Sequence, residues 1–114
     1  MFKKFEDLAV WQKSKEMTVS IYQVSNNIKD YGFKDQIQRA SVSVMNNIAE
    51  GFERGTQAEF KRFLYIAKGS CGETRSMLIL AHEIEYIDKD IKDKLTAQTE
   101  EISKMLSGLI KTLH

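Results

Sequence analysis

The sequence contains no proline and only six glycines among its 114 residues. An all-β fold needs turn residues at roughly every 8–12 positions, so this scarcity argues against that class and favours a few long helices. A single cysteine, Cys71, excludes an intramolecular disulfide and a cysteine-rich zinc site, which is typical of proteins of the reducing cytoplasm. No stretch approaches the roughly 18 apolar residues of a membrane span, and Glu6 and Asp7 interrupt any signal-peptide core.

An excess of charge of one sign is also lacking. The chain has 17 Lys and Arg residues against 16 Asp and Glu residues, for a net charge of +1. This balance excludes a disordered polyelectrolyte and a histone-like condenser, so any function that depends on charge must be local. With 42% hydrophobic residues, the chain fits one compact domain over residues 1–114. We therefore expect a cytoplasmic protein with no membrane association.

Four amphipathic segments follow one another, at about residues 7–28, 35–52, 57–87 and 89–113. Tyr31-Gly32 is expected to end the first segment. Thr56 and Glu59 form a capping box, in which each is expected to bond the other's backbone, and Asp88 is a suitable N-cap for the last segment. Because short joints make neighbouring helices antiparallel, we predict an all-α protein folded as an antiparallel up-and-down four-helix bundle.

A continuous polar stripe runs along the second predicted helix, with steps of three and four residues. Its members are Gln36, Arg39, Ser43, Asn47 and Glu50. Such a stripe is either a solvated or inter-helix hydrogen-bonding face, or a binding surface. We expect Asn47 and Glu50 to be held in a hydrogen-bonded network at a helix or subunit contact rather than to perform chemistry.

Cations recur every seven residues along the third predicted helix, at Lys61, Lys68 and Arg75, with Tyr65 close to the same strip. Such a strip can follow several phosphates while the tyrosine stacks on a base, as in nucleic-acid binders. An ordinary solvated face is the competing interpretation. The candidate nucleic-acid-binding residues are Arg39, Lys61, Arg62, Tyr65, Lys68 and Arg75.

The third helix carries a second apolar line besides its core stripe, formed by Ile66, Met77, Leu80 and Ile84. A monomeric bundle would not usually leave this much apolar surface exposed, so we expect these residues at a subunit interface of a homo-oligomer. Gly69 and Gly72 lie within the same helix, where each costs up to about 1 kcal/mol relative to alanine. A close backbone approach is the expected reason for them.

The sequence lacks the residue combinations that are typical of enzyme active sites. His82 and His114 are the only histidines, and neither stands in a metal-binding motif. Cys71 lies on the core stripe, where a small buried hydrophobe is expected rather than a nucleophile. We therefore expect a non-enzymatic protein with no catalytic residue, no metal site and no cofactor.

Three segments of the sequence resemble a known family. They are QIQRASVSVMNNIAEGFERG at residues 36–55, EFKRFLYIAKGS at residues 59–70 followed by Glu73, and FEDLAVW at residues 5–11. These segments resemble the signatures of the four helix bundle proteins, also called 23S rRNA intervening-sequence proteins, and the resemblance covers essentially the whole chain.

The resemblance implies a cytoplasmic bundle that assembles into a ring-shaped homo-oligomer, a pentamer in particular. The family is similar to the accessory variability determinant of diversity-generating retroelements, a basic pentameric bundle that binds a reverse transcriptase and nucleic acid; this chain lacks its strong positive charge. We expect an oligomeric bundle that binds structured RNA, or DNA, by phosphate contacts. The alternative is a protein-interaction scaffold or accessory subunit that binds a protein partner and no nucleic acid.

Overall fold

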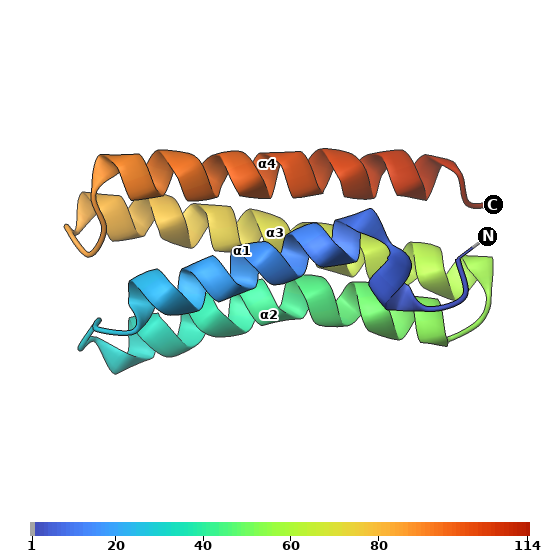
Figure 1. Cartoon of the computed structure of the whole chain (residues 1–114), viewed down its shortest axis with the longest axis horizontal. Coiled ribbons are helices and arrows are strands. Elements are labelled where there is room, and N and C mark those ends of the chain that lie inside the picture. The colour runs from blue at the N-terminus through green and yellow to red at the C-terminus, as the bar shows by residue number, and fades with distance from the viewer. Residues whose placement is uncertain (1) are drawn as a thin grey trace.

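The structure, a computed structural model that describes residues 2–114, consists of helices joined by short turns (Figure 1). Its elements are the short 3-10 helix η1 (Phe5–Asp7) and the α-helices α1 (Ala9–Ser25), α2 (Tyr31–Glu53), α3 (Gln57–Glu83) and α4 (Lys89–Lys111). The described residues contain no strand and form a rod of 43 × 21 × 19 Å. The predicted all-α class and antiparallel four-helix bundle are confirmed.

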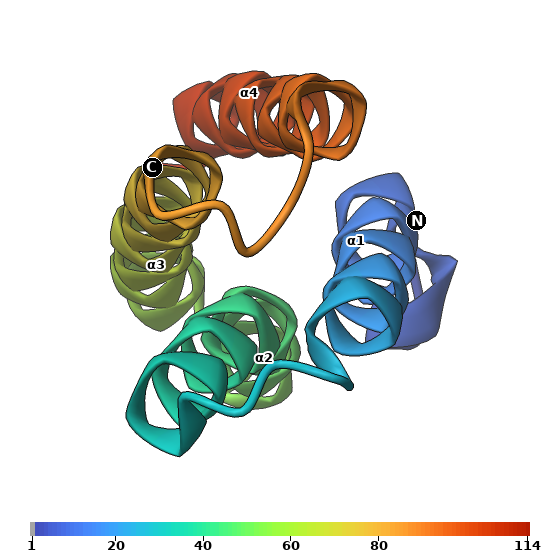
Figure 2. The same ribbon diagram turned by 90° about the vertical axis from the view of Figure 1, so that its left-hand side faces the viewer.

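Each helix packs against two neighbours, so that the four helices stand at the corners of a square (Figure 2). Helix α2 contacts α1 and α3, while α4 contacts α3 and α1. The space between them is filled by fully buried side chains from all four helices, among them Met17, Ile48, Leu64 and Leu106. This core follows the apolar stripes of the sequence, since each helix turns its stripe toward the bundle axis.

Helix α2 begins four residues earlier than the sequence indicated. The Asp30 side chain accepts a hydrogen bond from the Phe33 backbone N–H at 3.1 Å and so caps a helix that starts at Tyr31. Tyr31-Gly32 therefore opens α2 and does not end α1, which stops at Ser25. A side-chain cap at Asp30 outweighs the weak helix preference of one glycine.

The joint between α3 and α4 also differs from the prediction. Helix α3 ends at Glu83 rather than near Ile87, and Glu85 adopts the left-handed conformation with φ of 64°. Asp88 caps α4 as predicted, since its side chain accepts from the Ile91 N–H at 2.8 Å. Ile87, between them, returns to the core.

The predicted capping box of α3 forms only in part. Thr56 Oγ1 accepts from the Glu59 N–H at 3.2 Å, as expected. The Glu59 carboxylate turns instead to two arginines, Arg62 at 2.8 Å and Arg54 at 3.5 Å. A charged partner attracts the carboxylate more strongly than the cap N–H does.

The close backbone approach occurs at a different glycine from those predicted. A Cβ atom at Gly51 would lie 2.6 Å from Cβ of Phe63, so this glycine lets α2 approach α3 where their turn joins them. Gly69 and Gly72 have open space at the same position, because both lie on the exposed side of α3. The expected packing role of Gly69 and Gly72 is therefore wrong.

Candidate nucleic-acid interface

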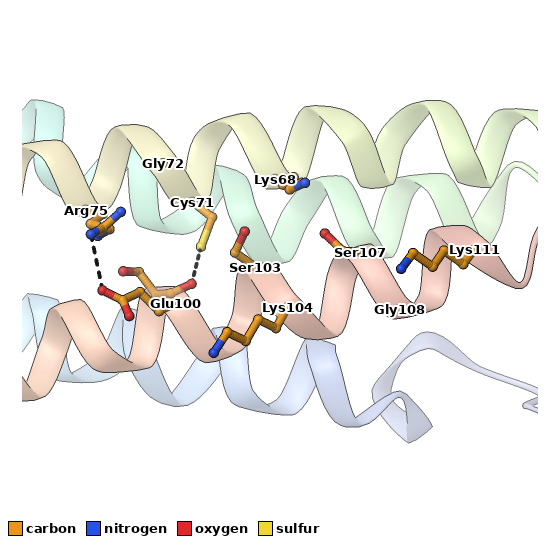
Figure 3. Close-up of a pocket in the computed structure, with 11 residues that line it drawn as sticks. Lys68, Cys71, Gly72, Arg75, Glu100, Ser103, Lys104, Ser107, Gly108 and Lys111 are labelled. Atoms are coloured by element: carbon orange, nitrogen blue, oxygen red, sulfur yellow. Dashed lines mark hydrogen bonds and ion pairs between the residues drawn. The ribbon is translucent and has the colours of Figure 1, made fainter.

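A groove of about 630 Å³ runs along the outer seam between α3 and α4 (Figure 3). Gly72 of α3 and Ser103, Ser107 and Gly108 of α4 lie along it. None of these residues has a side chain longer than a hydroxymethyl group, so the seam is hollow where larger side chains would fill it.

Four cations flank this hollow: Lys68 and Arg75 on α3, and Lys104 and Lys111 on α4. The two cations on each helix are seven residues apart, so they lie on nearly the same face of that helix. Glu100 is the one carboxylate among the residues that line the groove. The groove therefore concentrates positive charge although the whole chain carries only +1.

One of the four cations is paired. Arg75 Nη2 lies 3.2 Å from Glu100 Oε1, with both side chains about half exposed. The ion pairs within residues 2–114 involve none of the three groove lysines. These three ammonium groups are therefore available to an anionic ligand.

Cys71 lies at the floor of the groove, and its thiol is inert. Its Sγ donates a hydrogen bond to the backbone carbonyl of Thr99 at 3.1 Å, and the residue is 1% exposed. Burial raises the pKa of the Cys71 thiol from 9.0 to about 11, so the thiol is neutral at physiological pH. This is the packing role that the sequence indicated, and the thiol also helps hold α3 against α4.

The structure brings only some of the predicted binding residues to the groove. Lys68 and Arg75 line it, and Tyr65, 55% exposed, lies one turn before Lys68 on the outer surface of α3. Lys61 is half-buried two turns before Lys68 and is not among the lining residues.

Arg39 and Arg62 lie elsewhere and are engaged by acids. Arg39 pairs with Asp35 at 2.8 Å and borders a separate hollow beside Tyr22 of α1. Arg62 pairs with Glu59, and its guanidinium lies 4.5 Å from the centroid of the Phe63 ring. Of the six candidate residues, Lys68 and Arg75 therefore line the α3–α4 groove, while Arg39 borders a different hollow.

Sequence reasoning missed Lys104 and Lys111. Their seven-residue spacing on α4 repeats the spacing of Lys68 and Arg75 on α3, and this repetition was a readable signal. What the sequence did not show is that the two pairs face one groove, because that depends on how α3 and α4 are rotated against each other.

The polar stripe of α2 divides into separate contacts. In its middle, Ser43 Oγ and Ser70 Oγ are 2.8 Å apart and link α2 to α3, while Asn47 Nδ2 donates to the Ser43 carbonyl at 2.7 Å and to Oγ at 2.9 Å. At one end, Glu50 accepts from Arg54 at 2.8 Å. At the other end, Gln36 is exposed. The stripe thus connects helices in its centre and is solvated at both ends.

The second apolar line of α3 is shorter than predicted. Met77 is 7% exposed and belongs to the core, so its assignment to an outer interface is wrong. Ile66, Leu80 and Ile84 remain between 42% and 48% exposed. Met77 differs because its position on the helical wheel falls at the edge of the buried stripe, where the bundle covers it.

No group of three or more His, Cys, Asp and Glu side chains within residues 2–114 is arranged to hold a metal ion. None of the helices described has both the length and the apolar character needed to cross a membrane.

Comparison with known proteins assigns the family. The model of the family described as "23S rRNA-intervening sequence protein" matches residues 6–108. The chain belongs to this family. A solved structure of a protein with unknown function from the S23 ribosomal protein family of Bacteroides thetaiotaomicron VPI-5482 is similar, with 31% sequence identity and a TM-score of 0.85. The alignment covers 90% of this chain and 99% of that one. A search of the curated proteins gives no match.

The family match includes most of the groove. Lys68, Arg75 and Lys104 lie within the matched residues, and Lys111 follows three residues after their end. Three of the four groove cations thus lie within the part of the chain that the family model matches.

Proposed function

We propose that this 23S rRNA-intervening sequence protein is a non-enzymatic bundle that binds nucleic acid, structured RNA in particular, by phosphate contacts in the α3–α4 groove. The observation that carries the proposal is the set of four cations around a floor of glycine and serine, of which the three lysines take part in none of the ion pairs among residues 2–114. Lysines that neutralise phosphates release condensed counterions, and this release drives binding that is independent of base sequence.

The groove offers little for reading bases. Three of its four cations are lysines, which act as point charges, and its arginine already has a carboxylate partner. Direct readout of base edges uses forked donors such as free arginine, asparagine or glutamine. We therefore expect similar affinity for RNAs of unrelated sequence.

Self-association would strengthen binding to a groove whose own affinity is weak. Ile66, Leu80 and Ile84 form an outward apolar line on α3 that burial between subunits would remove from water. We propose a homo-oligomer built on this line in the cytoplasm, with the pentameric ring as its expected form. Each added subunit brings another groove, and linked grooves raise avidity without new contacts.

The test compares charge reversals on and off the groove. Lys68→Glu and Lys104→Glu are expected to weaken binding of a 20-nucleotide RNA about tenfold or more, and to lower the slope of log affinity against log salt by about 1. Lys94→Glu, on the exposed surface of α4 outside the groove, is the matched control and should have a much smaller effect. Fluorescence anisotropy at two salt concentrations measures both quantities.

The same experiment distinguishes the alternative function. The exposed apolar line on α3 also suits a scaffold that binds a protein partner. RNA binding that does not depend on salt, or that is unchanged by Lys68→Glu while the oligomer stays intact, would contradict the phosphate groove and favour the scaffold.

A further inference from the structure

We infer that the α3–α4 groove takes one strand of nucleic acid rather than a duplex. This inference rests on the proposed function and specifies its ligand as a single-stranded segment, of which a structured RNA carries many in loops and junctions. Three features carry it: the order of the cations along the groove, the width of the groove, and the position of Tyr65.

The four cations alternate between the two walls of the groove. The Arg75–Glu100 ion pair and the Cys71–Thr99 hydrogen bond set the register of the two antiparallel helices. Lys104, four residues after Glu100, therefore lies between Arg75 and Lys68, and Lys111 lies beyond Lys68. Figure 3 shows this order, with the cations coming alternately from α3 and α4.

The spacing of these cations along the groove suits the phosphates of one strand. Seven residues of α-helix span about 10 Å, so a cation from the other helix placed between them leaves about 5 Å between neighbours along the groove. Successive phosphates of an extended strand are separated by a similar distance. One strand that lies between the two walls can thus bring successive phosphates near cations of α3 and α4 in turn.

The width of the groove excludes a duplex from its floor. Packed helices have axes about 8–10 Å apart, and a nucleic-acid duplex is wider than this. The floor at Gly72 and Gly108 can be approached by the backbone of one strand. A duplex would rest on the two helices and could not bring one of its strands down to this floor.

Tyr65 supplies a contact that only unpaired bases can use. Its ring is 55% exposed and lies on the outer surface of α3, one turn before Lys68. A base of a strand lying beside Lys68 can turn outward and stack on this ring, as bases do on the aromatic side chains of single-strand binders. In a duplex the bases are already stacked on one another, so they cannot stack on this ring.

The experiment compares one sequence as a single strand and as a duplex. The probes are a fluorescent 12-nucleotide RNA without self-complementarity, the DNA of the same sequence, and the duplex of each with its complement, all at one salt concentration. The single strands are expected to bind at least tenfold more tightly than their duplexes. Binding of both RNA and DNA strands would support phosphate recognition, and binding of RNA alone would support the single strand with added contacts to the 2′-hydroxyl.

Tyr65→Leu tests the stacking contact. It is expected to weaken single-strand binding about tenfold and to leave duplex binding unchanged. Tyr31→Leu is the control, because Tyr31 is equally an exposed tyrosine, 73% accessible, at the start of α2. Both sites are on the surface, and thermal melting followed by circular dichroism verifies that each variant is folded.

The outcomes separate this inference from the function on which it rests. Equal or tighter binding of the duplexes would overturn the single-strand inference while leaving the phosphate groove in place. Single-strand binding that Tyr65→Leu does not weaken would overturn the stacking contact. If no probe binds at low salt, the proposed function itself is overturned.

Discussion

Arg75 of α3 and Glu100 of α4 face each other across the groove at 3.2 Å. The pair connects the two helices that flank the groove, and it also neutralises one of the four cations there. Both side chains are about half exposed, so the pair stabilises the fold only weakly. A phosphate that binds beside Arg75 must compete with Glu100, and this carboxylate therefore limits the affinity of the groove.

Glu100→Gln is expected to tighten RNA binding. Removing the carboxylate frees Arg75 for phosphate, and an exposed pair is worth about 0.2–1 kcal/mol, which corresponds to a gain of roughly 1.4- to fivefold. Glu101→Gln is the control, because it removes the same charge from the other side of α4. There Glu101 Oε1 lies 3.7 Å from Lys13 Nζ. Anisotropy titrations of the two variants should differ, and equal affinities would show that Glu100 does not restrain the groove.

Leu80→Glu is expected to dissociate the proposed oligomer. Leu80 is 48% exposed, and a carboxylate placed there would be buried without a partner when subunits meet. The dissociation constant should rise roughly tenfold or more, as measured by light scattering at micromolar concentrations. Ala97→Glu adds the same charge to an exposed position of α4 and should leave the mass unchanged. A wild-type protein that scatters as a monomer would contradict the proposed assembly.

Gly51→Ala and Gly69→Ala are expected to shift stability in opposite directions. At Gly51 the new methyl group would meet Cβ of Phe63 at 2.6 Å, so the two helices must move apart at a cost of about 1–2 kcal/mol. At Gly69 the methyl group enters open space, and the better helix propensity of alanine adds up to about 1 kcal/mol. Urea unfolding of both variants measures the difference, and the same sign for both would refute this account.

Cys71 is expected to make the protein less stable at alkaline pH. Burial raises the pKa of its thiol from 9.0 to about 11, so between these values the unfolded chain loses the proton and the folded one keeps it. Unfolding thereby becomes easier as pH rises, by roughly 2 kcal/mol at pH 11. Cys71→Ala should unfold more readily at neutral pH and lose less stability between pH 8 and 11 than wild type. Parallel pH dependences in urea titrations would show that the thiol does not contribute.

Much of the fold could be predicted from local patterns. The caps at Thr56 and Asp88 and the three- and four-residue spacing of apolar side chains indicate where helices start and which face is buried. The predicted helix boundaries were wrong where two local signals competed, as at Asp30 and Gly32. Whether a cap outweighs a glycine depends on whether the hydrogen bond of the cap forms, as it does at Asp30.

Only the α3 side of the candidate site could be predicted from the sequence. Lys68 and Arg75 share one face of one helix, and the repeat of seven residues shows this directly. Met77 was misplaced because a helical wheel gives the angle of a side chain but not the width of the surface that neighbouring helices cover.

The sequence by itself determined four amphipathic helices, their connection as an antiparallel bundle, and the face that each turns inward, because these depend on residues within a few positions of one another. Only the tertiary structure decided that Lys104 and Lys111 join Lys68 and Arg75 around one groove, that Glu100 stands among them, and that Gly51 is the point of close approach. Those relationships depend on the rotation and register of one helix against another, which are set when side chains far apart in the chain pack together.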